Sequence, residues 1–159
     1  MQRMRWGIPL AVGAAVVMTG AFRAATRDSI PYPDGYRQWR HVKSALTGLG
    51  GADQSFHHIY ANEKAIVGYT TGRFPDGAVI VFDKLTGSAT NGTIREGARR
   101  LVDVMQRDSA RFRTSGGWGY EEFVGDSRTP SLDESRRAAC HTCHTQKQAQ
   151  GFVFSALRP

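Results

Sequence analysis

Hydrophobic and polar residues alternate along several short stretches of the chain, which is the pattern of strands that bury one face. Residues 41–47 alternate, Ser55–Ala61 follow, residues 78–85 have the highest β-branched content, and Trp118–Val124 form a fourth candidate strand. Glycines separate these stretches at short intervals, and residues 87–92 are expected to be loop. The pattern predicts an α+β fold, mainly β, with an antiparallel sheet and a few short helices.

Three other segments carry helical signals. Asn62 suits the N-cap of a helix over residues 62–71, and Gly72 suits the turn that ends it. Residues 32–39 combine turn residues with aromatic ones and predict a short helix. Between residues 98 and 110, apolar residues recur at helical spacing, so periodicity alone predicts a helix there.

A further helix is expected just before the two cysteines. Pro130 suits the first helical turn, and Ser131 with Glu134 has the spacing of a capping box. The predicted helix, residues 132–139, would end where the cysteines begin. The apolar residues beyond them are expected to cover a cofactor or the core: Phe152, Val153, Phe154 and Leu157.

The N-terminus has the composition of an export signal. Arg3 and Arg5 precede residues 7–21, an uncharged apolar stretch of 15 residues. A bilayer-spanning helix needs about 20 residues, so a signal peptide over residues 1–21 is expected, with an uncleaved anchor as the alternative. Either interpretation places one folded domain, residues 28–159, in the periplasm.

The net charge gives little information about partners. Removal of residues 1–21 takes away two arginines and no acidic residue, so the formal charge falls from +7 to +5. The remaining basic residues are scattered, which argues against nucleic-acid binding, as export also does. A modest positive field would suit docking to an acidic redox partner protein.

The two cysteines carry the clearest chemical signal. They occur together with a histidine in Cys140-His141-Thr142-Cys143-His144, the C-x-x-C-H signature of covalent haem attachment. Two intervening residues let both sulfur atoms reach the vinyl groups of one porphyrin, and His144 then serves as the proximal ligand of the iron. The expected cofactor is one covalently attached haem c with its iron.

Other uses of the motif fit less well. A disulfide over this spacing closes a very short loop and leaves His144 without a role. A thioredoxin-like redox site normally lies in a βαβ unit, which the pattern does not predict here. A zinc site through His141 and His144 lacks a second ligand pair. An iron–sulfur cluster normally needs four thiolates. Haem attachment requires export, and the expected export signal agrees with it.

The chain resembles the cytochrome P-460 family, which includes the cytochrome c′-beta proteins, over about residues 30–158. The turn Phe74-Pro75-Asp76-Gly77 and the strand after it, upstream of a C-terminal haem motif, are the most specific feature. The resemblance implies a largely β fold, a homodimer and a five-coordinate haem. It also implies a strand over residues 101–108, which we adopt over the helical periodicity. The other segments that carry the resemblance are residues 36–39, 41–42, 58–60, 116–118, 140–144 and 153–154.

The resemblance also suggests residues for the distal side of the haem. Hydroxylamine-oxidising members carry a haem-linked lysine where this chain has Phe82, whereas cytochrome c′-beta members cap the iron with phenylalanine. Lys84 lies two residues beyond Phe82 and shares its strand face, but its offset does not match. A distal arginine and a distal acid of the oxidising members fall near His57 and Asp103. His57 would donate a hydrogen bond or ligate the iron, and Asp103 would relay protons.

Each distal residue also has an ordinary interpretation: a core phenylalanine, a surface histidine and a surface carboxylate. His58 should face the opposite side of its strand from His57.

Three functions follow from these alternatives. The first is binding of a small diatomic ligand such as NO or CO, and the second is oxidation of hydroxylamine or a related nitrogen compound. The third is electron transfer, which needs a sixth iron ligand. The candidates for that ligand are Met105, His41, His57 and His58.

Overall fold

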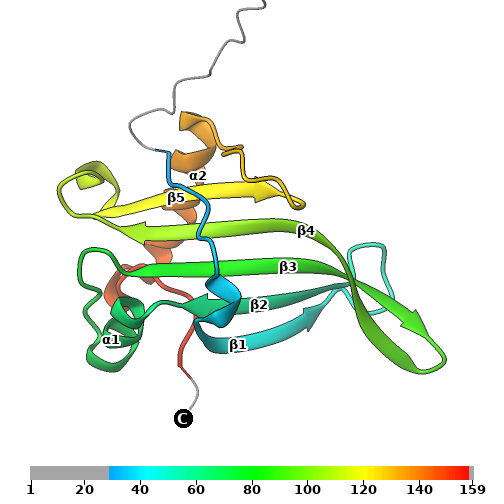
Figure 1. The fold of residues 1–159 in the computed structure, drawn as a ribbon. Helices are drawn as coiled ribbons and strands as arrows, with labels where there is room; N and C mark the ends of the chain where they lie inside the picture. Colours follow the sequence, from blue (N-terminus) through cyan, green and yellow to red (C-terminus); the bar gives the residue numbers. More distant parts are fainter. Residues whose placement is uncertain (1–28, 158–159) are drawn as a thin grey trace, which may run out of the picture.

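The computed structural model describes residues 29–157, which form a five-stranded antiparallel sheet with two helices (Figure 1). The strands lie side by side in chain order, each paired antiparallel with the next. They are β1 (Arg40–Thr47), β2 (Ser55–Ala61), β3 (Val79–Thr90), β4 (Thr93–Arg107) and β5 (Trp118–Val124). The expected fold class, α+β and mainly β, is confirmed.

The first helix, α1 (Glu63–Thr71), begins and ends as expected. The Asn62 side chain accepts a hydrogen bond from the Ala65 amide, and Gly72 adopts the left-handed conformation with φ of 76°. The short helix expected over residues 32–39 is a single 3₁₀ turn, Tyr36–Gln38. Two more 3₁₀ turns follow at Arg113–Ser115 and Thr145–Gln150.

Of two predictions about β3 and β4, the strand over residues 101–108 is confirmed and the loop over residues 87–92 is wrong. The strand implied by the resemblance is confirmed, because β4 pairs with β3 on one side and β5 on the other. The loop expected over residues 87–92 is wrong, because β3 and β4 continue beyond the sheet as a two-stranded arm (Figure 1). Asn91 and Gly92 both have positive φ at its tip, as the two-residue turn of a tight hairpin requires.

The second helix, α2 (Glu134–His144), begins and ends later than expected. Asp133 is its N-cap and accepts from the Arg136 amide, while the Ser131 hydroxyl instead donates to the Glu122 carbonyl. The helix also continues to His144, so both cysteines lie inside it.

The two faces of the sheet are covered by different parts of the chain. One face, here called the helical face, packs against α1, α2 and the C-terminal segment, and its strand residues include Ile80 and Tyr120. The opposite face, here called the N-terminal face, is covered by residues 30–39, which cross the strands in Figure 1, and includes Val81 and Phe123. Each face has its own buried core.

The expected signal peptide, residues 1–21, lies outside the described residues. Within residues 29–157, the helices are too short or too polar to cross a membrane.

Candidate functional site

The two cysteines lie on the last two turns of α2, where the helix packs against β5. Cys140 is half-buried against the core of the helical face, Cys143 is exposed, and both thiols are free. Residues three positions apart are neighbours on a helix surface, so both sulfur atoms point to the same side of α2. His144 follows on the final turn.

A backbone carbonyl orients the His144 imidazole. Its Nδ1 lies 2.7 Å from the Phe152 oxygen, and a carbonyl can only accept, so Nδ1 carries the proton and Nε2 keeps its lone pair. Burial lowers the pKa of His144, and the bond to Phe152 opposes that shift only in part. A neutral imidazole held through its far nitrogen is the usual state of a metal-ligating histidine.

The carbonyl reaches His144 through an unusual backbone turn. Gly151 and Phe152 both have positive φ, 68° and 67° respectively. For a residue with a side chain, this conformation costs about 1–3 kcal/mol and persists only where surrounding structure holds it. The turn returns the chain after the Thr145–Gln150 helix so that Phe152 contacts both His144 and His141.

Aromatic rings surround the imidazole of His144. The centroid of the Tyr120 ring lies 5.1 Å from it, and the Phe154 ring lies 5.0 Å away, edge-on. Phe154 is 48% exposed and forms part of the surface next to the motif. Val153 is buried and Phe152 and Leu157 pack on the same core, so the C-terminal apolar residues cover this region as expected.

The helical face also carries the expected distal residues. Phe82 is paired with Asp103 on β4, and His57 is paired with Lys84 on β3, so all four side chains lie on this face. The rings of His57 and Phe82 are 4.7 Å apart. The structure thus brings Phe82, His57 and Asp103 together on the side of the sheet that α2 covers, with Lys84 beside them.

Asp103 has the more unusual environment of the two polar distal residues. Burial, with a smaller effect of the Glu122 charge, raises its pKa to about 7, while Lys84 and Arg136 partly oppose the shift. Within residues 29–157 its carboxyl group makes no hydrogen bond. It therefore exchanges a proton near neutral pH.

His57 is already engaged by neighbouring hydroxyl groups. Its Nε2 lies 3.1 Å from the Ser55 hydroxyl and 3.3 Å from that of Thr47. Burial and the charge of Lys84 lower its pKa, so the neutral imidazole is favoured.

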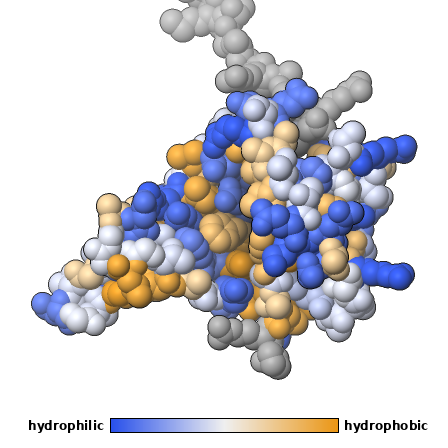
Figure 2. Space-filling view, turned by 180° about the vertical axis from the view of Figure 1, so that it is seen from behind, coloured by the Kyte–Doolittle hydropathy of each residue, from blue (hydrophilic) through white to orange (hydrophobic). Residues whose placement is uncertain are grey.

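Two buried polar atoms beside the motif lack partners. The Tyr120 hydroxyl and His141 Nδ1 make no hydrogen bond within the described residues, although both are inaccessible to solvent. Such atoms normally find a partner, and a polar group bound beside α2 would supply one. In the view from behind the sheet, apolar atoms reach the surface between the arm and the rest of the molecule (Figure 2). The residues at this place therefore fit a haem, which is largely apolar and has polar edges.

The positions of the candidate sixth ligands on the sheet show which of them could reach an iron held beside α2. His41 and His58 lie on the N-terminal face, so the sheet separates them from α2. Met105 lies on the helical face but packs into its core. Among residues 29–157, no group of three or more His, Cys, Asp or Glu side chains could hold a metal ion by itself.

The sequence does not single out Tyr120 or the turn at Phe152. Tyr120 carries no motif, although alternation along Trp118–Val124 places it on the same face as Glu122 and Trp118. Nothing in the residue types predicts a positive φ at Phe152, because phenylalanine rarely adopts it.

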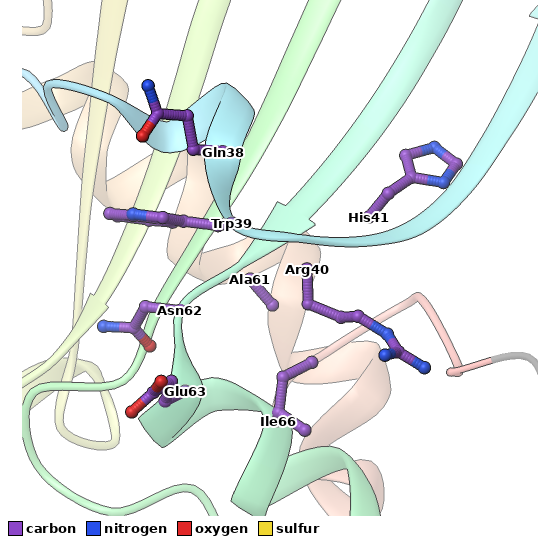
Figure 3. Close-up of a pocket in the computed structure, with 8 residues that line it drawn as sticks. All are labelled: Gln38, Trp39, Arg40, His41, Ala61, Asn62, Glu63 and Ile66. Atoms are coloured by element: carbon purple, nitrogen blue, oxygen red, sulfur yellow. The ribbon is translucent and has the colours of Figure 1, made fainter.

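A separate cleft of about 630 Å³ lies near the start of α1, away from the cysteines. Figure 3 shows the Trp39 ring above Asn62 and Glu63, with Ile66 below and Arg40 to one side. The Asn62 side chain there is already bonded to three backbone groups. The other lining residues are Gln38, His41 and Ala61.

Comparison with known proteins gives one family. The model of the Cytochrome P460 family matches residues 33–155, which include most of both core regions and the whole C-x-x-C-H motif. No curated protein sequence matches the chain.

Proposed function

The chain belongs to the cytochrome P460 family, a family of haem proteins, and on this basis we propose that it carries one covalent haem c with an open iron position. We infer that this position binds a small diatomic ligand such as NO or CO. The chain is exported to the periplasm, with residues 1–21 as signal peptide or anchor, and acts as a homodimer.

The observation that carries the proposal is the free Nε2 of His144 beside two free thiols. Cys140 and Cys143 would hold the porphyrin through thioether bonds, formed as each S–H adds across a vinyl group. His144 Nε2 would coordinate the iron, while burial favours the neutral ring and the Phe152 carbonyl holds it in place. When bound, the haem supplies an iron that takes up an external ligand and changes its oxidation state.

Phe82 favours a small uncharged ligand. It lies on the helical face, with its ring against His57 and with Ile59 as its neighbour on β2. Aromatic and aliphatic side chains at this place exclude water and provide no strong ligand for a metal ion. A redox partner protein would exchange electrons with such a site.

Asp103 supports a second candidate, oxidation of hydroxylamine or a related nitrogen compound. A carboxyl group with a pKa of about 7 accepts a proton at neutral pH and is suited to general-base work. His57 is the second polar group on that face. A covalent link from Lys84 to the haem would favour this candidate over ligand binding.

Electron transfer has less support than either candidate. Two of the four residues that could supply a sixth ligand, His41 and His58, lie on the opposite face of the sheet. The remaining two are Met105, which packs into the core, and His57, whose Nε2 bonds to hydroxyl groups.

The absorption spectrum of the reduced holoprotein tests the proposal. We expect a high-spin ferrous spectrum that changes on addition of CO or NO. A red-shifted chromophore that survives denaturation would instead support hydroxylamine oxidation through a cross-linked haem. A low-spin ferrous spectrum that CO leaves unchanged would overturn both and support electron transfer.

A further inference from the structure

A second group of histidines lies on the N-terminal face, on the opposite side of the sheet from the cysteines. His41 Nε2 is 2.8 Å from the Ser44 hydroxyl, and His58 Nδ1 is 2.6 Å from the same oxygen. Two imidazole nitrogens thus converge on one point, the position of the Ser44 oxygen. The sequence indicates both histidines only as candidate iron ligands, and the proposed haem site uses neither of them.

The local structure of β1 explains the convergence. Ser44 and His58 are direct partners across β1 and β2, and the register shifts between His41 and Lys43. A bulge of this kind adds one residue to a strand and redirects the next side chain. It therefore places His41, three residues before Ser44, on the same face as Ser44.

The arm of β3 and β4 supplies the remaining polar partner. The Glu96 carboxylate lies 2.6 Å from His58 Nε2, the ring nitrogen that points away from Ser44. This contact lacks the geometry of a hydrogen bond, but the negative charge of Glu96 favours the tautomer with the proton on Nε2, which leaves the Nδ1 lone pair directed at the Ser44 oxygen. Metal-binding histidines commonly have a carboxylate next to their outer nitrogen.

We propose that His41 Nε2 and His58 Nδ1 bind one divalent transition-metal ion, with the Ser44 oxygen beside it and Glu96 supporting His58. Imidazole ligands suit Zn²⁺, Cu²⁺ and Ni²⁺ rather than Ca²⁺ or Mg²⁺. Two protein nitrogens leave other coordination positions for water, so the site would be open.

The site combines a rigid ligand with an accessible one. The His58 side chain is only 13% exposed, stacks on the Phe56 ring with the planes 6° apart, and has the Glu96 carboxylate beside it. His41 and Ser44 are exposed, so an ion can enter from solvent. His41 also rests edge-on against the Tyr60 ring, at a centroid distance of 5.5 Å. The two ring centroids are 6.2 Å apart, so the exposed His41 must move toward His58 and shift its proton to Nδ1 for both nitrogens to share one ion.

Calorimetric titration of the ferric holoprotein with Zn²⁺ tests the site. We expect one ion per chain, and affinity at least tenfold weaker in His41→Ala and in His58→Ala. Glu96→Gln should weaken binding by about 10- to 100-fold, the range seen for supporting carboxylates. His57→Ala removes a histidine from the same strand but the opposite face, so it should leave Zn²⁺ affinity unchanged.

A gain of affinity separates this proposal from a loss of folding. Ser44→His adds a third imidazole at the point of convergence and should tighten Zn²⁺ binding at least tenfold. If the double variant His41→Ala/His58→Ala binds Zn²⁺ as tightly as the parent, or if the parent binds none, the proposal is wrong.

Discussion

Asp83 and Asp103 are carboxylates on adjacent strands, one position apart in register, and they point to opposite faces of the sheet. Asp83 is fully buried on the N-terminal face and accepts hydrogen bonds from the Tyr36 hydroxyl, Arg37 and Arg99. These partners outweigh burial and hold its pKa below the usual value. Asp103, on the helical face, has no such partner within residues 29–157, and its pKa rises to about 7.

The two environments suggest different roles: Asp83 stabilises the fold, whereas Asp103 is suited to chemistry. The satisfied carboxylate fixes the N-terminal segment to the sheet, because Tyr36 and Arg37 belong to that segment. The unsatisfied one lies among the residues expected around a haem. Perturbed carboxyl groups without compensating partners are a feature of functional sites.

The largest expected effect on stability comes from removing the Asp83 charge on the N-terminal face. Asp83→Asn removes the charge that neutralises Arg37 and Arg99, and Arg99 has only 15% of its side chain exposed. We expect the free energy of unfolding in urea to fall by about 3 kcal/mol, as for other buried ion pairs that lose one partner.

The matched control for this variant is Asp126→Asn. That carboxylate also pairs with Arg99, but its side chain is 86% exposed, so its loss should cost less than about 0.5 kcal/mol. Equal losses from the two variants would contradict the structural role assigned to Asp83.

A smaller effect of opposite sign is expected on the helical face. The pKa of Asp103 is raised in the folded state, so the folded protein holds its proton to higher pH than the unfolded chain does. The ionised group therefore opposes folding increasingly from about pH 4 to pH 7, and fully above that. Asp103→Asn should stabilise the protein by about 1–2 kcal/mol at pH 8 and by less at pH 5.

Urea unfolding of the parent and of Asp103→Asn at both pH values measures this dependence. A gain that is the same at pH 5 and pH 8 would show that Asp103 titrates normally in the folded protein. Hydroxylamine oxidation, if the holoprotein has it, should fall in the same variant.

The smallest of the three effects concerns the phenylalanines of the two faces. Phe82→Ala should speed CO association with the reduced holoprotein by about tenfold, equivalent to about 1.4 kcal/mol, because it opens the distal side. Phe56→Ala removes a ring from β2 on the N-terminal face and should leave the rate unchanged. Stopped-flow mixing measures both, and similar rates in the two variants would remove Phe82 from the distal side.

Local signals predicted much of the framework. Asn62 and Gly72 mark the ends of α1 because capping depends on single residue types. Asn91-Gly92 is a strong hairpin signal that the loop expected over residues 87–92 did not take into account, and its positive φ values suit the turn between two long strands. The helical periodicity around residues 98–110 predicts the wrong element, because hydrogen-bonded pairing with two neighbouring strands outweighs the local preference for a helix.

The sites depend on contacts that local patterns do not encode. Spacing identified Cys140, Cys143 and His144, and alternation placed Phe82 and Lys84 on one face. The contact of Glu96 with His58 depends on how far the arm extends, and the carbonyl that orients His144 depends on a strained turn at Phe152. The start of α2 at Asp133 rather than Ser131 reflects the bond of Ser131 to β5.

The mass of the exported protein under denaturing conditions tests the central claim most directly. We predict a mass greater than that of the mature polypeptide by one haem, and loss of that increment in the double variant Cys140→Ser/Cys143→Ser. A wild-type mass equal to the bare polypeptide, in cells that mature other c-type cytochromes, would contradict covalent attachment and with it the proposed function.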